Sequence, residues 1–102
     1  MTLKFSASIK KMSTQILLAM IIANEIYANR GLNMVITSVS DSVHSKTSLH
    51  YSGFACDLRT NGISIPIIEA IVSDLKLRLT KEFDIVHEVD HIHIEYQPKN
   101  VL

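Results

Sequence analysis

The sequence predicts an α+β domain whose small, mostly antiparallel sheet has two helices packed on one face. Three observations predict this fold. The chain has 102 residues, the length of one domain, and it is 47% hydrophobic and 20% charged, as folded globular proteins are. Two segments place apolar residues at helical spacing, and several short runs of branched or alternating residues are typical of strands. The expected order is helix, strand, strand, helix, strand, strand.

The first helix is expected to begin at Ser13 or Thr14, either of which can cap it, and to run to about Asn29, with Gly31 closing it. Its apolar face is expected to carry Ile16, Leu17, Met20, Ile21, Ala23 and Tyr27. The apolar run Ile16–Ala23 has eight residues, too few to span a membrane. Lysines ahead of it imitate the front of a signal peptide, but cleavage near its end would remove this helix. We therefore expect a core helix, no convincing signal peptide and no membrane insertion.

The remaining elements follow in order along the chain. Strands are expected at Asn33–Val39, Phe54–Leu58, Asp84–Val89 and His91–Tyr96. The polar stretch Ser40–Ser48 is typical of a turn. Pro66 suits the first turn of a second helix that runs to about Thr80. The inward face of this helix is expected to carry Ile68, Ile71, Val72, Leu75 and Leu79.

Charge and cysteine content exclude two classes of protein. Ten basic residues balance ten acidic ones, so the formal net charge is zero, which argues against a protein that neutralises nucleic-acid phosphates. The single cysteine, Cys56, cannot form an internal disulfide, which excludes a disulfide-stabilised secreted scaffold. We expect Cys56 to be a small core residue, because it points to the opposite side of its strand from Asp57.

The last expected strand gathers polar groups on one face. Strict alternation puts His91, His93 and Glu95 on one side and two isoleucines on the other. The isoleucines are expected to face the helices, so two imidazoles and a carboxylate would line the opposite face, which suits a polar cleft. By itself this pattern is at least as typical of a solvated sheet face.

A second polar segment, residues 48–57, leads into the expected strand Phe54–Leu58. His50 and Asp57 are seven residues apart, so on one continuous strand they would point to opposite faces. They can share a target only if the chain turns between them, and residues 51–53 (Tyr-Ser-Gly) allow a turn there. Taken alone, this segment favours a solvated loop histidine and an aspartate at a strand end.

Together the two segments supply one aspartate and two histidines, with Asp90 three residues before His93. Three nitrogen and oxygen ligands suit a catalytic zinc site, in which the metal keeps a fourth position for water and lowers its pKa to about 7. A nearby carboxylate that is not a ligand can take the proton of that water. A structural zinc site usually has four ligands, including several cysteines. The combined pattern therefore predicts a zinc cleft on the sheet face opposite the helices.

Two motifs resemble those of a known family. Ser-x-His-x-x-Gly-x-Ala-x-Asp-Leu spans residues 48–58, and Asp-x-x-His-x-Glu spans residues 90–95. Their order, spacing and residue types are similar to those of the zinc D-alanyl-D-alanine carboxypeptidases and dipeptidases, a family that includes the L-alanyl-D-glutamate endopeptidases of phage endolysins. The resemblance covers residues 34–99 and is to compact, phage-type members. It implies a single zinc peptidase-like domain over residues 1–102 with the helix-and-sheet fold expected above.

The resemblance implies roles for the matching residues. His50, Asp57 and His93 match the zinc ligands, with one Zn²⁺ per chain. Asp90 matches the general base, which lies three residues before the last ligand. Ser48 matches a residue that helps to hold the backbone of the substrate.

Other positions are assigned less directly. His91 matches a histidine that can orient substrate or stabilise the oxyanion. Many members carry an arginine on the loop after the first strand; this region has none here, and His44 and Lys46 are the alternatives for its role. His87 and Glu88 are expected to be surface residues.

These features predict a zinc metallopeptidase that hydrolyses bacterial peptidoglycan stem peptides, of the D-Ala-D-Ala carboxypeptidase or L-Ala-D-Glu endopeptidase type, encoded by a bacteriophage. The alternative is a non-catalytic zinc-bearing binding module of the same fold. Asp90 favours the enzyme, and the missing arginine favours the binding module. We expect synthesis in the host cytoplasm and action at the cell wall or in the periplasm, with a holin or a virion for delivery.

Overall fold

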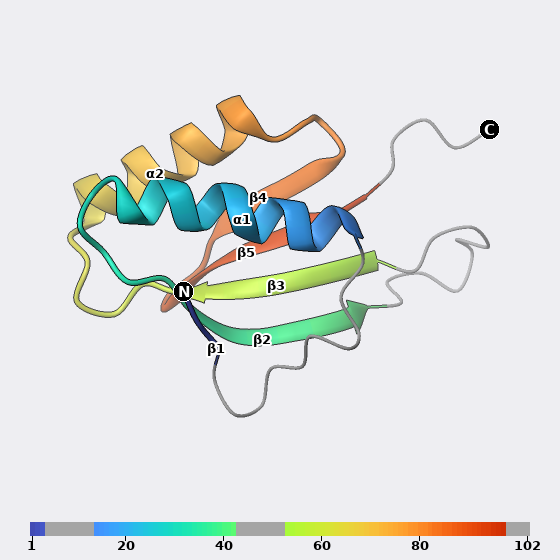
Figure 1. The fold of residues 1–102 in the computed structure, drawn as a ribbon, viewed down its shortest axis with the longest axis horizontal. Coiled ribbons are helices and arrows are strands. Elements are labelled where there is room, and N and C mark those ends of the chain that lie inside the picture. The colour runs from blue at the N-terminus through green and yellow to red at the C-terminus, as the bar shows by residue number, and fades with distance from the viewer. Residues whose placement is uncertain (4–13, 43–52, 98–102) are drawn as a thin grey trace.

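The computed structural model describes residues 1–3, 14–42 and 53–97 and confirms the predicted α+β class (Figure 1). Its elements are β1 (Thr2–Leu3), α1 (Thr14–Ala28), β2 (Val35–Ser42), β3 (Gly53–Arg59), α2 (Ile65–Arg78), β4 (Phe83–His87) and β5 (His91–Tyr96). The elements from α1 to β5 follow the predicted order. The two-residue strand β1 was not predicted.

The strands form one five-stranded sheet in the order β1-β2-β3-β5-β4. The β1–β2 pair is parallel, and the other three pairs are antiparallel. Both helices lie on the same face of this sheet (Figure 1). β3 and β5 are neighbours within the sheet although α2 and β4 separate them in the sequence. Side chains from two distant parts of the sequence can therefore meet on the face that the helices leave open.

Local sequence explains where α1 ends and where α2 begins. After α1, the backbone N–H of Leu32 donates to the carbonyl of Tyr27, and that of Gly31 donates to the carbonyl of Ala28. This Schellman motif requires a residue with a left-handed backbone, and Gly31 adopts it with a φ of 70°. Pro66 lies in the first turn of α2, where its missing N–H costs no helical hydrogen bond. Both predicted signals are confirmed.

The core lies between the helices and the sheet. Ile92 and Ile94 of β5 are fully buried in it, as are Cys56 and Leu58 of β3. The residues predicted to face inward from the second helix all take part: Ile68, Ile71 and Leu75 of α2 are buried, as is Leu79 just after its end, and Val72 packs partly against them. Because side chains alternate along a strand, the residues between these core positions face the other way. Asp57 is one of them.

The predicted inner face of α1 is partly wrong. Leu17 and Ile21 are 44% and 54% exposed, whereas Ala19 and Ile26 are buried. The buried residues of α1 are Ile16, Ala19, Met20, Ala23, Ile26 and Tyr27. They recur every three or four positions, as one face of an α-helix must, but α1 is apolar on almost every side, so sequence spacing alone did not select that face. Neither described helix has the length and apolar content needed to cross a membrane.

Several strand boundaries also differ from the prediction: β2 begins at Val35 rather than Asn33, β3 extends one residue further at each end, and β4 begins at Phe83. β2 continues to Ser42, into the stretch expected to be a turn, because it remains paired with β3 over that length. β4 ends at His87 rather than Val89. There the backbone N–H of Glu88 donates to the carbonyl of His91, which closes the turn into β5.

Candidate metal centre

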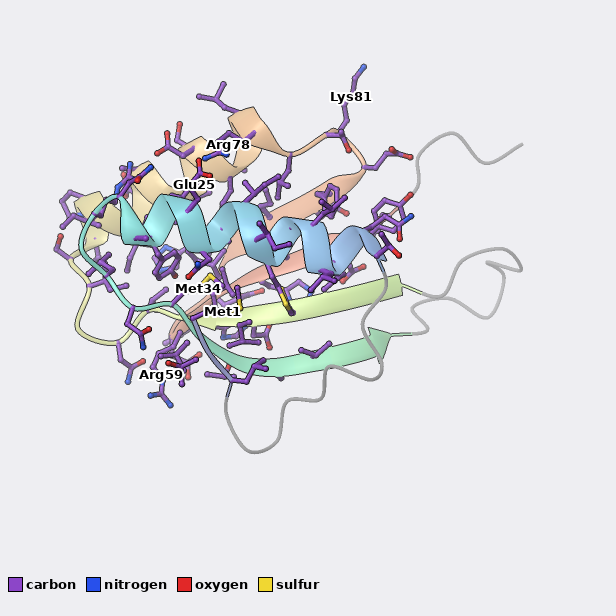
Figure 2. All side chains as sticks on the ribbon, in the orientation of Figure 1. Met1, Glu25, Met34, Arg59, Arg78 and Lys81 are labelled. Atoms are coloured by element: carbon purple, nitrogen blue, oxygen red, sulfur yellow. The ribbon has the colours of Figure 1, made fainter. Side chains whose placement is uncertain are left out.

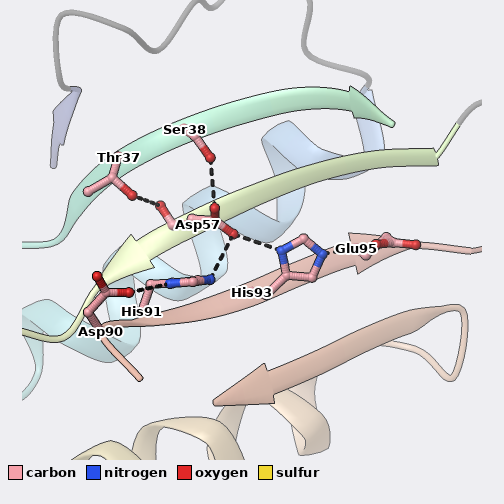
Figure 3. Close-up of polar contacts among 7 residues, drawn as sticks. All are labelled: Thr37, Ser38, Asp57, Asp90, His91, His93 and Glu95. Atoms are coloured by element: carbon pink, nitrogen blue, oxygen red, sulfur yellow. Dashed lines mark hydrogen bonds and ion pairs between the residues drawn. The ribbon is translucent and has the colours of Figure 1, made fainter. Parts of the chain in front are cut away.

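Three neighbouring strands present polar side chains on the sheet face away from the helices (Figure 3). Asp57 of β3 is paired across the ladder with His93 of β5, and Arg59 is paired with His91. Ser38 of β2 reaches Asp57 from the other side. The predicted grouping of His91, His93 and Glu95 on the face opposite the buried isoleucines is confirmed.

Asp57, His91 and His93 form a compact group, which we call the Asp–His–His cluster. Oδ1 of Asp57 lies 2.7 Å from Nδ1 of His93 and 3.6 Å from Nε2 of His91. Each residue can offer one ligand atom, and these three atoms lie within 4.8 Å of one another. The cluster is therefore close enough to hold a metal ion.

Two further carboxylates orient the histidine rings of the cluster. Oε1 of Glu95 lies 2.9 Å from Nε2 of His93, and Oδ1 of Asp90 lies 2.7 Å from Nδ1 of His91. When each ring donates its N–H to that carboxylate, its other nitrogen presents a lone pair toward Asp57. Histidines that bind metals usually donate their second ring N–H to a carboxylate or carbonyl in this way.

The spacing of the ligand atoms also suits a tetrahedral divalent ion. With metal–ligand bonds of about 2.0 Å, ligand atoms are about 3.3 Å apart. The Asp57–His91 distance of 3.6 Å already fits, and the Asp57–His93 hydrogen bond of 2.7 Å would have to open slightly. Oγ of Ser38 donates to Oδ2 of Asp57 at 2.8 Å, which leaves Oδ1 directed toward the histidines. Imidazole with carboxylate is a donor set that suits several divalent transition metals.

The same contacts set the electrostatics of the cluster. Burial lowers the pKa of His93, but hydrogen bonds and charges from Glu95 and Asp57 outweigh it, so the pKa of His93 is raised above its ordinary value. Glu95 is only 6% exposed and also accepts a hydrogen bond from the Gln97 side chain. The pKa of Asp90 is lowered, chiefly by its hydrogen bond to His91. Asp90 is therefore an ionised carboxylate at neutral pH, with a side chain that is 76% exposed.

The predicted site residues divide into two groups. Asp57 and His93 are brought together as predicted, and Asp90 lies beside them through its contact with His91. His91 was expected to contact the substrate. It lies close enough to Asp57 and His93 to be a metal ligand as well. The other four predicted residues, His44, Lys46, Ser48 and His50, lie outside the described residues.

The residues expected to have no part in the site behave as predicted. Cys56 is 1% exposed and belongs to the core. Burial, with the neighbouring charge of Asp57 as a smaller cause, raises the pKa of its thiol to about 12, so it is neither a nucleophile nor a metal ligand at neutral pH. His87 and Glu88 are exposed.

Sequence reasoning missed two residues of this face. Ser38 meets Asp57 because the β2–β3 register shifts between Ile36 and Ser38, and no pattern in the sequence indicates that irregularity. Arg59 was missed because the strand was expected to end at Leu58; β3 includes Arg59, which follows Asp57 at the two-residue spacing of one strand face.

We compared the chain with family models, curated proteins and solved structures, and none of the three comparisons finds a match.

Proposed function

We propose that this protein is a zinc-dependent peptidase that hydrolyses peptidoglycan stem peptides, as a D-Ala-D-Ala carboxypeptidase or an L-Ala-D-Glu endopeptidase. The observation that carries the proposal is the contact between Oδ1 of Asp57 and Nδ1 of His93, 2.7 Å apart. The two residues belong to separate sequence motifs. Asp57 lies on β3, before α2 in the sequence, and His93 lies on β5, after it. Their meeting on the open sheet face is what a metal site built from both motifs requires.

Asp57 and His93 would hold the metal, with His50 as the third ligand and one zinc ion per chain. A bound zinc ion would supply a Lewis acid that polarises a peptide carbonyl and lowers the pKa of water. Ser38 and Glu95 act on the ligands: Ser38 fixes the carboxylate of Asp57, and Glu95 fixes the ring of His93 with Nδ1 toward the site.

Asp90 is the proposed general base. Its carboxylate is ionised at neutral pH and largely exposed, so it can accept a proton from water and pass it to the leaving amine. Its Oδ1 accepts a hydrogen bond from His91, which holds the carboxylate beside the cluster. We propose that Ser48 and His91 contact the substrate, with His44 or Lys46 as a further cation near the scissile carbonyl.

A second function is favoured by one specific observation. His91 lies 3.6 Å from Asp57, within ligand range. If His91 joined His50, Asp57 and His93, the zinc would have four protein ligands and no open position, as in structural sites. Such a protein would be a zinc-bearing binding module for wall peptides rather than an enzyme. In either case we propose a phage-encoded protein that acts at the cell wall or in the periplasm, delivered by a holin or a virion.

Replacing Asp90 by Asn tests the proposed enzyme, because it separates the chemistry from metal binding. Asn keeps an oxygen that can accept from His91 but removes the charge. The variant should fold, keep its zinc and lose about 10²–10⁴-fold in cleavage of stem peptides. Glu88→Gln, at an exposed carboxylate two residues earlier, should cleave as the wild type does. Wild-type activity in Asp90→Asn together with an inactive Glu88→Gln would show that the base is misassigned.

A further inference from the structure

A hollow of ≈ 410 Å³ opens beside the Asp–His–His cluster. Its lining residues are Thr37, Arg59, Asn61, Asp90 and His91. His91 belongs both to the hollow and to the cluster, so the two are continuous. Figure 3 shows Asp90 and His91 at the start of β5 and Thr37 on β2, with β3 between them, and Figure 2 shows Arg59 near the end of the sheet.

Strand geometry brings Arg59 to this hollow. It follows Asp57 by two residues on β3, so both lie on the face away from the helices, with their Cα atoms about 7 Å apart. It is also the direct cross-strand partner of His91. Arg59 therefore lies on the same open face of the sheet as the proposed ligands Asp57 and His93.

Within the described part of the chain, the guanidinium of Arg59 makes no hydrogen bond or ion pair, and the same holds for the side-chain amide of Asn61. The other two arginines with described side chains do have acidic partners: Arg30 pairs with Asp74 at 2.6 Å, and Arg78 with Glu25 at 2.8 Å. Asp90, which also lines the hollow, is held by His91 instead. The hollow is thus lined by a cation and an amide whose donors the described residues leave unused.

We propose that Arg59, assisted by Asn61, binds a free carboxylate of the substrate, located on the carbon next to the scissile nitrogen. This inference rests on the proposed peptidase function and specifies its substrate. A guanidinium can hold a carboxylate through two parallel hydrogen bonds, which gives geometric selectivity as well as affinity. Ionised Asp90 lines the same hollow and repels a carboxylate, so the carboxylate of the substrate is favoured at Arg59 rather than at Asp90.

Both candidate bonds of a stem peptide share this chemistry. In D-Ala-D-Ala, the scissile nitrogen belongs to the terminal alanine, whose α-carbon bears the free C-terminal carboxylate. In L-Ala-D-Glu, it belongs to a glutamate that continues through its γ-carboxyl, so its α-carboxylate is also free. Arg59 can therefore bind either source, and the peptides used as probes distinguish them.

Two pairs of synthetic peptides test the proposal on the zinc-loaded full chain. The first pair is N-acetyl-L-lysyl-D-alanyl-D-alanine and its C-terminal amide. The second pair is L-alanyl-γ-D-glutamyl-L-lysine and the same peptide with an α-carboxamide on the glutamate. The measured quantity is the ratio of kcat/KM for the acid to that for the amide, with KM and kcat resolved separately.

In the wild type we expect a preference for the acid of roughly 10- to 100-fold in at least one pair, the size of a charged hydrogen-bonded contact. Arg59→Gln should bring this ratio close to one, mainly through KM, and Arg59→Lys should keep part of it. Arg78→Gln, which removes one charge on the helix layer, should keep the wild-type ratio. The pair that shows the preference identifies the carboxylate. An unchanged ratio in Arg59→Gln would overturn the proposal.

Binding measurements separate this inference from the peptidase itself. If the wild type cleaves none of the peptides, the proposed enzyme fails, and calorimetric titration with the same four peptides decides the role of Arg59. Acid peptides that bind at least roughly tenfold more weakly to Arg59→Gln than to the wild type would support it. Equal affinities, or no binding of the acid peptides to the wild type, would overturn it. Zinc content and circular dichroism show whether each variant is folded. If Arg59→Gln is not folded, Arg59→Lys is measured in its place.

Discussion

His93 lies between two carboxylates: its Nδ1 is 2.7 Å from Oδ1 of Asp57, and its Nε2 is 2.9 Å from Oε1 of Glu95. Asp57 reaches it across the β3–β5 ladder, and Glu95 comes from two positions further along β5. One carboxylate can thus fix the ring while the other shares a metal with it.

His93→Ala should remove most of the bound zinc, because two remaining ligands hold the metal too weakly. Metal analysis after dialysis measures zinc per chain. His87→Ala is the matched control, since His87 is an exposed histidine on the neighbouring strand β4 and outside the cluster. Full zinc content in the His93 variant would contradict the ligand assignment.

His50 and His91 compete for the place of the third ligand. His50→Ala is expected to lose most of its zinc, whereas His91→Ala should keep it and lose activity toward stem peptides. If His91→Ala loses its zinc and His50→Ala keeps it, the ligands are the three residues of the Asp–His–His cluster. Loss of zinc in both variants would indicate four protein ligands and favour the binding module over the enzyme.

The raised pKa of His93 predicts opposite effects of pH on the metal-free and zinc-loaded protein. Without metal, the contacts of protonated His93 stabilise the fold below the unfolded pKa of about 6.5, and this contribution is lost as pH rises through the higher folded pKa. Zinc instead needs neutral His93, so the stabilisation by zinc should grow as pH rises through the same interval. Melting temperatures measured from pH 5 to 8, with EDTA or with zinc, test both signs. A zinc-induced shift in Tm that is equal at pH 5 and pH 8 would contradict this prediction.

Alanine substitutions of two isoleucines test which face of α1 packs against the sheet. Ile16 is fully buried, and Ile21 is 54% exposed. Ile16→Ala should lower the free energy of unfolding by about 2–5 kcal/mol through the lost burial and the cavity. Ile21→Ala should change it by no more than about 0.5 kcal/mol. Urea denaturation of both variants gives the two values, and equal losses would show that the observed inner face of α1 is wrong.

The sequence allowed the polar face of β5 to be predicted because strand alternation is local. Once Ile92 and Ile94 were assigned to the core, His91, His93 and Glu95 had to face the other way. The core position of Cys56 and the closure of α1 by Gly31 were predicted for similarly local reasons.

What could not be predicted depends on non-local pairing or on a choice between equivalent faces. β1 has two residues and exists through its parallel pairing with β2. Ser38 reaches Asp57 through an irregular register. Leu17 was assigned to the wrong side because α1 is apolar nearly all round, so the spacing of its apolar residues does not single out the face that packs against the sheet.

The most direct test of the central claim is the release of new amino groups from a purified peptidoglycan digest, identified by mass spectrometry. The zinc-loaded wild type should release D-alanine or generate free amino termini on D-glutamate. The same protein stripped with EDTA should release neither until zinc is restored. Intact stem peptides after incubation with folded, fully zinc-loaded protein would contradict the peptidase, and binding of those peptides without cleavage would favour the zinc-bearing binding module.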